Sequence, residues 1–178
     1  VCQTLDDLSI AYVRTREPGG TPMAETLREN MLAEWDESVN GLTELFIAFA
    51  ARLQHVDGVI RPALLSGKWV VCDRFTDASY AYQGYGRGLD LEKIAVLEEW
   101  VHGDLQPDLT LYLDLDPEVA ALRIANRDRD RMEQEQMSFF HKVRQGYLAR
   151  VSADSRFRTV DASLPLVEVQ QLVCQQIR

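Results

Sequence analysis

The chain has 178 residues and a mass of 20.3 kDa, the size of one domain with a hydrophobic core of its own. Apolar residues make up 46% and charged residues 26% of the chain, which excludes intrinsic disorder and fibrous repeats. The formal net charge of −9 argues against a broad electrostatic surface for nucleic acid or an anionic membrane, and we expect neither as a partner.

The cysteines indicate the compartment. Cys2, Cys72 and Cys174 form an odd set without C-x-x-C spacing, so we expect buried thiols and neither a disulfide framework nor a zinc site. No apolar run approaches the roughly 18 residues of a membrane helix, and no signal-peptide pattern opens the chain. These features favour a cytoplasmic protein.

The first half of the chain contains two predicted strands and two predicted helices. The opening VCQTLDDL has no N-cap signal and reads as the last turns of an earlier helix, so we expect the natural N-terminus upstream of Val1. A short buried strand is predicted over 10–14, and Thr21 followed by Pro22 predicts a helix start. Apolar residues recur at helical spacing over 42–66, and a strand follows over 69–72.

The second half continues this alternation. We predict further strands over 109–115 and 157–160, and helices over 90–100, from 116, over 133–151 and over 165–176. Strands that alternate with helices imply parallel βαβ units, so we predict a single α/β domain over 1–178, with a doubly wound parallel sheet and helices on both faces. Ligands bind such sheets outside the carboxyl ends of the strands, which makes the residues directly after each strand candidates for a site.

Two charged residues, Asp73 and Arg74, directly follow the strand predicted over 69–72. They form either a structural ion pair or a site in which Arg74 binds a phosphate and Asp73 positions magnesium or water. Their place at the ligand edge of the sheet favours the second interpretation.

The loop after the first strand reads TREPGGT over 15–21. Taken alone, Pro-Gly-Gly is a turn signal. The charged residues Arg16 and Glu17 at the exit of the strand favour a binding loop instead, in which Arg16 reaches a phosphate.

In the helix over 42–66, Arg52 follows Phe49 by three residues, so both side chains can project from one face. That face offers an aromatic ring to stack on a base and a donor for the exocyclic oxygen of the base. A single arginine extending along an apolar helix face is the commoner arrangement, and that alternative stays open. Residues 79–88 mix hydroxyl, aromatic, amide and glycine groups, a composition typical of a binding loop, with Ser79, Tyr82 and Gln83 as its candidates.

A run of arginines lies among acidic residues between two predicted helices; it comprises Arg123, Arg127, Arg129 and Arg131. Such a run is by default a solvated charged surface. The alternative is a lid over about 123–135 whose arginines close over transferring phosphoryl groups.

Together these segments resemble the thymidylate kinase family over nearly the whole chain. Four ordered segments carry the resemblance: TREPGGT at 15–21, FAARLQH at 49–55, DRFTDASYAYQGYGRGL at 73–89 and DRMEQE at 130–135. The resemblance implies a three-layer fold of the P-loop NTPase type, transfer of a phosphoryl group from ATP with Mg²⁺ to dTMP, and a homodimer.

The resemblance also implies a role for each candidate at the phosphate end. Arg16 and Arg74 would hold the dTMP phosphate beside Glu17, and Asp73 would lie near the magnesium ion and its waters. The lid arginines that act on the phosphates would be drawn from Arg127, Arg129 and Arg131, with Arg123 as a further candidate.

At the base end, the resemblance implies that Phe49 stacks on thymine and that Arg52 bonds a thymine carbonyl. Ser79 and Gln83 would bond the remaining polar edge of the base, and Tyr82 would line the deoxyribose region. Some relatives carry the aromatic residue four positions before the arginine, where this chain has an alanine at position 48.

One departure from the family pattern bears on function. The family opens with a strand and a phosphate-binding loop of the G-x-x-x-x-G-K-[ST] kind, and this sequence contains no such motif. We expect the first strand and that loop upstream of Val1. A chain that truly lacked the loop would instead be a noncatalytic nucleotide-binding module. A kinase for another nucleoside monophosphate is the nearer alternative.

Overall fold

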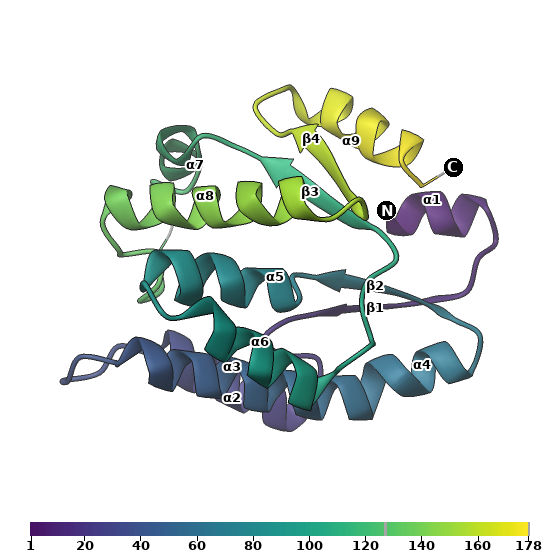
Figure 1. Ribbon diagram of the computed structural model, residues 1–178. Helices are drawn as coiled ribbons and strands as arrows, with labels where there is room; N and C mark the ends of the chain where they lie inside the picture. Colours follow the sequence, from purple (N-terminus) through teal and green to yellow (C-terminus); the bar gives the residue numbers. More distant parts are fainter. Residues whose placement is uncertain (127, 178) are drawn as a thin grey trace.

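The alternation of strands and helices predicted from the apolar pattern is present in the structure, a computed structural model that describes residues 1–126 and 128–177 (Figure 1). Helix α1 (Cys2–Asp7) precedes strand β1 (Tyr12–Arg16) and helix α2 (Pro22–Leu32). The start of α2 is as predicted, because the Thr21 side chain accepts a hydrogen bond from the Ala24 amide at 3.2 Å and Pro22 occupies the first turn.

The long helix predicted over 42–66 is present in three consecutive parts. Helix α3 (Gly41–His55) continues through a π-helical segment, η1 (Val56–Ile60), into helix α4 (Arg61–Leu65). Pro62 lies in the first turn of α4, where its missing amide hydrogen weakens the α-helical hydrogen-bond pattern with η1. Gly67, directly after the predicted helix range, ends the run in the left-handed region, with φ of 73°.

The segment after strand β2 (Trp69–Asp73) is helical, although the sequence predicted a loop. It consists of helix α5 (Thr76–Ser79) and a π-helical segment, η2 (Tyr80–Gly86). The interpretation of residues 79–88 as a binding loop is therefore wrong for 79–86. The candidate side chains on this segment stand on regular backbone, which holds them in fixed relative positions.

The remaining elements are, in order, α6 (Leu91–Val101), β3 (Thr110–Asp114), α7 (Pro117–Arg123), α8 (Met137–Ala153), β4 (Phe157–Asp161) and α9 (Leu166–Gln175). Asp90 and Asp116 cap α6 and α7 by accepting hydrogen bonds from backbone amides two residues ahead. Helix α8 begins later than predicted. Asp130 and Glu133 exchange side-chain and backbone hydrogen bonds and fold a separate turn before it.

The strands pair in parallel, which confirms the α/β prediction. Strand β1 pairs with β2, and β3 pairs with β4, each over five residues. Within residues 1–126 and 128–177, these pairs form two separate two-stranded sheets and not the single sheet that we predicted. A further first strand with a phosphate-binding loop stays a prediction.

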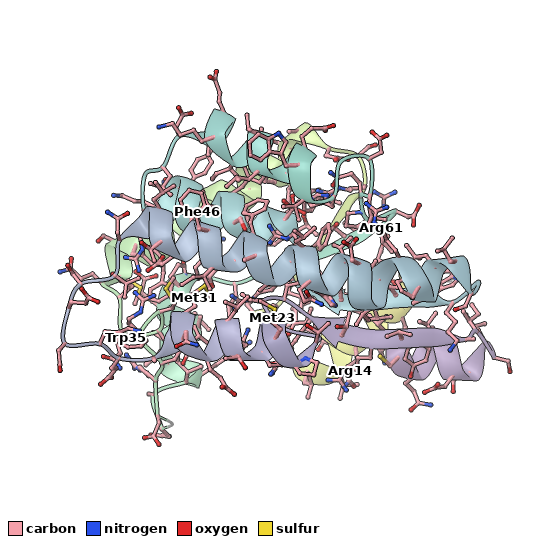
Figure 2. The ribbon with its side chains drawn as sticks, turned by 90° about the horizontal axis from the view of Figure 1, so that it is seen from below. Arg14, Met23, Met31, Trp35, Phe46 and Arg61 are labelled. Atoms are coloured by element: carbon pink, nitrogen blue, oxygen red, sulfur yellow. The ribbon has the colours of Figure 1, made fainter. Side chains whose placement is uncertain are left out.

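The helices form layers around the two sheets. Helices α2, α3 and α6 lie next to one another on one side of β1 and β2 (Figures 1 and 2). One core cluster joins α3, η2 and α6 through Leu45, Phe49, Tyr80 and Ile94. A second cluster joins η2 to α8.

Helix α8 approaches η2 closely at Gly146. A Cβ atom at this position would come within 2.8 Å of the Ala81 Cα atom. Only a glycine allows this distance between the two backbones.

None of the helices in the described part of the chain has the length and apolar character needed to cross a membrane.

Candidate functional site

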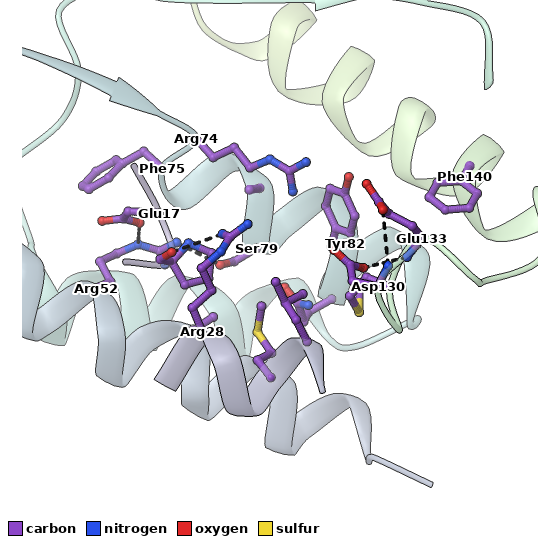
Figure 3. Close-up of a pocket in the computed structure, with 17 residues that line it drawn as sticks. Glu17, Arg28, Arg52, Arg74, Phe75, Ser79, Tyr82, Asp130, Glu133 and Phe140 are labelled. Atoms are coloured by element: carbon purple, nitrogen blue, oxygen red, sulfur yellow. Dashed lines mark hydrogen bonds and ion pairs between the residues drawn. The ribbon is translucent and has the colours of Figure 1, made fainter. Parts of the chain in front are cut away.

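A pocket opens at the carboxyl ends of β1 and β2, between α2, α3, the α5–η2 segment and the turn before α8 (Figure 3). The predicted site residues that line it are Glu17, Arg52, Arg74, Ser79, Tyr82 and Gln83. Arg28, Ala48 and Phe75 also line it, and the sequence analysis did not select them. The pocket lies where the switch-point rule for parallel sheets places ligands.

Arg52 reaches this pocket from α3 and is held on three sides. Its Nε donates to Glu17 Oε2 over 2.7 Å, its Nη2 donates to Ser79 Oγ over 3.1 Å, and its Cζ lies 4.5 Å from the centre of the Phe49 ring. The remaining nitrogen, Nη1, is buried and has no hydrogen-bond partner in the described chain. Because a buried donor is costly when unpaired, Nη1 is available for a ligand carbonyl oxygen.

Glu17 is the anion that holds Arg52, and only 2% of it is exposed. His55 Nδ1 lies 3.0 Å from the other carboxylate oxygen of Glu17, and His55 Nε2 lies 2.6 Å from Thr15 Oγ1. Burial alone would raise the pKa of Glu17, but the charge of Arg52 and the hydrogen bonds of His55 and Arg52 outweigh it and lower that pKa. Since both oxygens are engaged, Glu17 positions Arg52 and His55 and offers no free oxygen to the pocket.

The loop glycine Gly20 allows this network to form. Its φ is 87°, and a Cβ atom there would lie 2.4 Å from the His55 ring. A side chain at this position would be strained and would displace His55. The second glycine of TREPGGT is thus required by the close approach of the loop to α3.

Three predicted residues of the α5–η2 segment face the same pocket. Ser79 and Gln83 are buried, and the Ser79 hydroxyl accepts from Arg52. Tyr82 packs edge-on against Tyr147, with ring centres 6.4 Å apart. Successive helical turns bring the hydroxyl, the ring and the amide to one wall, so this wall offers both polar and aromatic contacts to a planar ligand.

Arg74 and Arg28 give the pocket a positive end. Figure 3 shows both guanidinium groups directed into the space between β2, α2 and Tyr82. Arg74 is exposed, and its φ of 68° is uncommon for a residue other than glycine. Burial and the neighbouring charges of Arg16 and Arg74 lower the pKa of Arg28. Converging arginines of this kind bind phosphate.

Arg28 had a signal in the sequence that we did not use. It follows Ala24 by four residues and precedes Met31 by three, and both of these residues are buried. Helical spacing therefore places a charged side chain next to the buried stripe of α2. Its Nη1 donates to the Pro18 carbonyl over 3.2 Å, which ties α2 to the TREPGGT loop.

Two predicted ligand residues lie elsewhere. Arg16 forms an exposed ion pair with Glu25, at 2.6 Å, and does not line the pocket. Phe49 belongs to the hydrophobic core below Arg52 and does not line the pocket either. The aromatic ring that lines the pocket near Arg52 is Phe75, whose ring centre lies 5.5 Å from the Arg52 Cζ atom.

The lid arginines differ from one another. Arg131 is anchored, because its Nη1 donates to Glu44 over 2.8 Å and its Nη2 to the Met31 carbonyl over 2.7 Å. These contacts direct it to α3 and α2, and it does not line the pocket, so its catalytic role stays a prediction. Arg129 is exposed and its side chain makes no hydrogen bond within the described residues. Arg127 lies outside the described residues.

The remaining candidate, Arg123, donates to the Ala162 carbonyl over 2.9 Å and does not line the pocket. It thus connects α7 to the turn after β4. Of the arginines that the sequence offered for the lid, Arg129 is the one in the described chain whose donors are available to a phosphate.

Asp73 ends β2, and its exposed carboxylate makes no hydrogen bond in the described part of the chain. No group of three or more His, Cys, Asp or Glu side chains that could hold a metal ion occurs among the described residues. Mg²⁺ that binds together with substrate phosphates needs only one or two protein carboxylates. A single free carboxylate directly before Arg74 fits an ion of that kind.

Comparisons with known proteins agree with this geometry. A family model described as thymidylate kinase matches residues 1–173. A thymidylate kinase of Pseudomonas savastanoi pv. phaseolicola is 60% identical over 163 residues, which cover 90% of this chain and 78% of the relative. One of Teredinibacter turnerae is 53% identical over 164 residues, covering 91% and 80%. One of Pseudomonas fluorescens (strain Pf0-1) is 54% identical over 173 residues, covering 96% and 82%. The chain belongs to the thymidylate kinase family.

Proposed function

We propose that the protein transfers the γ-phosphoryl group of ATP to the 5′-phosphate of dTMP and forms dTDP. The observation that carries this proposal is a single pocket with two different ends. Arg74 and Arg28 supply charge at one end, and the unpaired Nη1 of Arg52, with Ser79 and Gln83, supplies base-reading groups at the other. A nucleoside monophosphate has this polarity.

The reaction needs little covalent chemistry from the protein. The attacking phosphate oxygen of dTMP is already deprotonated near neutral pH, so no general base is required. Arg74 and Arg28 hold the acceptor phosphate, and Arg129 approaches the transferring group from a lid over about 123–135. Arg127 stays a further candidate for this role. Closure of that lid excludes water and limits hydrolysis of ATP.

Asp73 would hold Mg²⁺ through one carboxylate oxygen and its waters. When bound, the ion neutralises phosphate charge. We assign no other residue of these 178 to the metal. We also assign none to a phosphate-binding loop, since the sequence lacks the G-x-x-x-x-G-K-[ST] motif.

We further propose that the protein is a cytoplasmic homodimer. Three free cysteines agree with a reducing compartment. Apolar side chains stand exposed on α3 and on neighbouring α6: Leu42, Phe46, Leu53, Val96 and Trp100. Figure 2 shows Phe46 on the outer side of α3. Trp100 is 78% and Phe46 54% exposed. An apolar patch shared by two adjacent helices fits a second copy of the chain.

Calorimetric titration with dTMP, followed by measurement of ADP release with ATP and Mg²⁺, tests the proposed function. We expect dTMP binding and ADP release that depends on dTMP. A protein that does not bind dTMP would contradict the proposal. Binding of dTMP without any formation of dTDP would favour the noncatalytic nucleotide-binding module, and stronger binding of another nucleoside monophosphate would favour a kinase for that nucleotide.

A further inference from the structure

A buried carboxylate lies next to the base-reading end of the pocket. Glu44 on α3 is 0% exposed. Arg87 donates to both of its oxygens, over 2.8 and 3.0 Å, and Arg131 donates to Oε1 over 2.8 Å. Both oxygens of Glu44 thus accept from guanidinium groups, which have donors only, so the carboxylate serves here as an acceptor.

Glu44 controls which end of the Gln83 amide faces the pocket. The Gln83 Nε2 atom lies 3.4 Å from Glu44 Oε2. Because Glu44 only accepts, the NH₂ group of Gln83 must face it, and the amide oxygen is turned away from it. That oxygen accepts no hydrogen bond from residues 1–126 and 128–177, and Gln83 lines the pocket.

Helical spacing connects this carboxylate to the arginine that reads the base. Glu44, Ala48 and Arg52 follow one another at intervals of four on α3, so they share one face, and the last two line the pocket. The Arg52 guanidinium can only donate, and its Nη1 is unpaired. The base end thus combines a fixed donor from Arg52 with a fixed acceptor from Gln83.

We propose that Glu44 is a specificity-determining positioning residue, which sets the polarity of the pocket for a pyrimidine with a carbonyl at C4 and an N–H at N3. Thymine offers this pair, whereas cytosine reverses it with an amino group at C4 and an acceptor at N3. Glu44 itself does not touch the base. This inference rests on the proposed dTMP-binding function.

The substitution Glu44→Gln tests the proposal. Glutamine has nearly the same shape. Its oxygen at the Oε1 position still accepts from Arg87 Nη2 and Arg131 Nη1, while its NH₂ takes the Oε2 position, faces Gln83 and loses the bond from Arg87 Nε. The Gln83 amide then turns, and its own NH₂ enters the pocket. We expect the ratio of dissociation constants for dCMP and dTMP, measured by calorimetry, to fall by about tenfold or more. If Glu44 had a purely structural role, the substitution would weaken the binding of dCMP and dTMP equally and leave the ratio unchanged.

Glu135→Gln is the matched control. Glu135 also pairs with Arg87, over 2.6 Å, but it has no contact with Gln83. The same loss of one negative charge beside the same arginine should leave the dCMP-to-dTMP ratio within about twofold of wild type, because the polarity of Gln83 is unchanged.

A double-mutant cycle with Gln83→Met locates the effect. If Glu44 acts through the Gln83 amide, Glu44→Gln should change the nucleotide ratio by less than about twofold once that amide is absent. A tenfold change that persists in the Gln83→Met background would overturn the proposal. So would an unchanged ratio in the single Glu44→Gln variant.

Should Glu44→Gln fail to fold alone, the pair Glu44→Gln/Arg131→Met compared with Arg131→Met carries the same comparison, because it removes one charge of each sign. The wild-type protein separates this inference from the proposed function. Wild-type protein that does not bind dTMP contradicts the function itself. Wild-type protein that prefers dTMP, with variants whose ratio does not change, contradicts only the role of Glu44.

Discussion

Arg52 Nε lies 2.7 Å from Glu17 Oε2, and the two side chains are only 3% and 2% exposed. This ion pair joins Arg52 of α3, which lines the pocket, to the loop after β1. Removing one partner leaves the other charge buried, which costs about 3–5 kcal/mol in comparable pairs. The pair is therefore important for folding as well as for the site.

Glu17→Gln should lower the free energy of unfolding at pH 7 by about 3 kcal/mol. The pKa of Glu17 is lower in the folded state than in the unfolded state. Its stabilising effect is therefore complete above the unfolded value of about 4.3 and is lost as the pH falls through the folded value. Urea unfolding at several pH values should show the difference between wild type and Glu17→Gln shrinking only below about pH 4.3.

Glu25→Gln serves as the control for that series, since it breaks the exposed pair with Arg16. It should cost less than about 1 kcal/mol. A difference between wild type and Glu17→Gln that stays constant down to acid pH would contradict the assigned ion pair.

Arg74→Ala should weaken dTMP binding by about 100-fold, because it removes charge-assisted hydrogen bonds to the phosphate. Thymidine, which lacks the phosphate, should bind with an affinity within about twofold of wild type. Calorimetry with both ligands measures the difference. Equal losses for dTMP and thymidine would show that Arg74 supports the pocket and does not hold the phosphate.

Arg129→Met and Arg131→Met should affect different quantities. Arg131 is fixed by Glu44 and by the Met31 carbonyl, so its replacement should lower the free energy of unfolding by about 2 kcal/mol or more. Arg129 is exposed, so its replacement should leave stability within about 0.5 kcal/mol and reduce kcat at an unchanged KM for dTMP. Thermal unfolding measures the stability of the two variants, and steady-state kinetics measure their kcat and KM. A loss of stability in Arg129→Met, or a loss of kcat alone in Arg131→Met, would contradict these assignments.

Trp100→Glu should convert the proposed dimer into monomers, because it places a charge in the exposed apolar patch of α3 and α6. Sedimentation velocity measures the change in mass. Leu166→Glu is a matched control, since Leu166 is also exposed, at 71%, but lies on α9. A wild-type protein that sediments as a monomer, or a Trp100→Glu variant that remains a dimer, would refute the proposed interface.

Local sequence signals predicted most of the fold. The caps at Thr21, Asp90 and Asp116 and the cap glycine Gly67 are local features, so their meaning does not depend on distant partners. The helical nature of η2 was missed, because its glycines look like turn residues. Gly86 instead makes room for packing, since a Cβ atom there would lie 2.6 Å from the Phe139 ring.

The lining of the pocket was predictable where it depends on position directly after a strand, as for Arg74. It was not predictable where a side chain is fixed by a distant partner. Arg131 is held by Glu44, 87 residues earlier in the chain, and Arg16 is held by Glu25. No local sequence pattern distinguishes an arginine whose donors are free to bind a phosphate from one whose donors are already paired with a carboxylate.

The close approach of Gly146 to Ala81 has a mechanical consequence. Because the two backbones are in contact, α8 cannot shift toward η2 without moving it. The turn at 130–135 leads directly into α8, and η2 carries Gln83, so we expect a displacement of this turn along α8 to reach the Gln83 side of the pocket. The proposed lid and the proposed contact to the pyrimidine ring would thereby be linked mechanically through the backbone at Gly146 and Ala81.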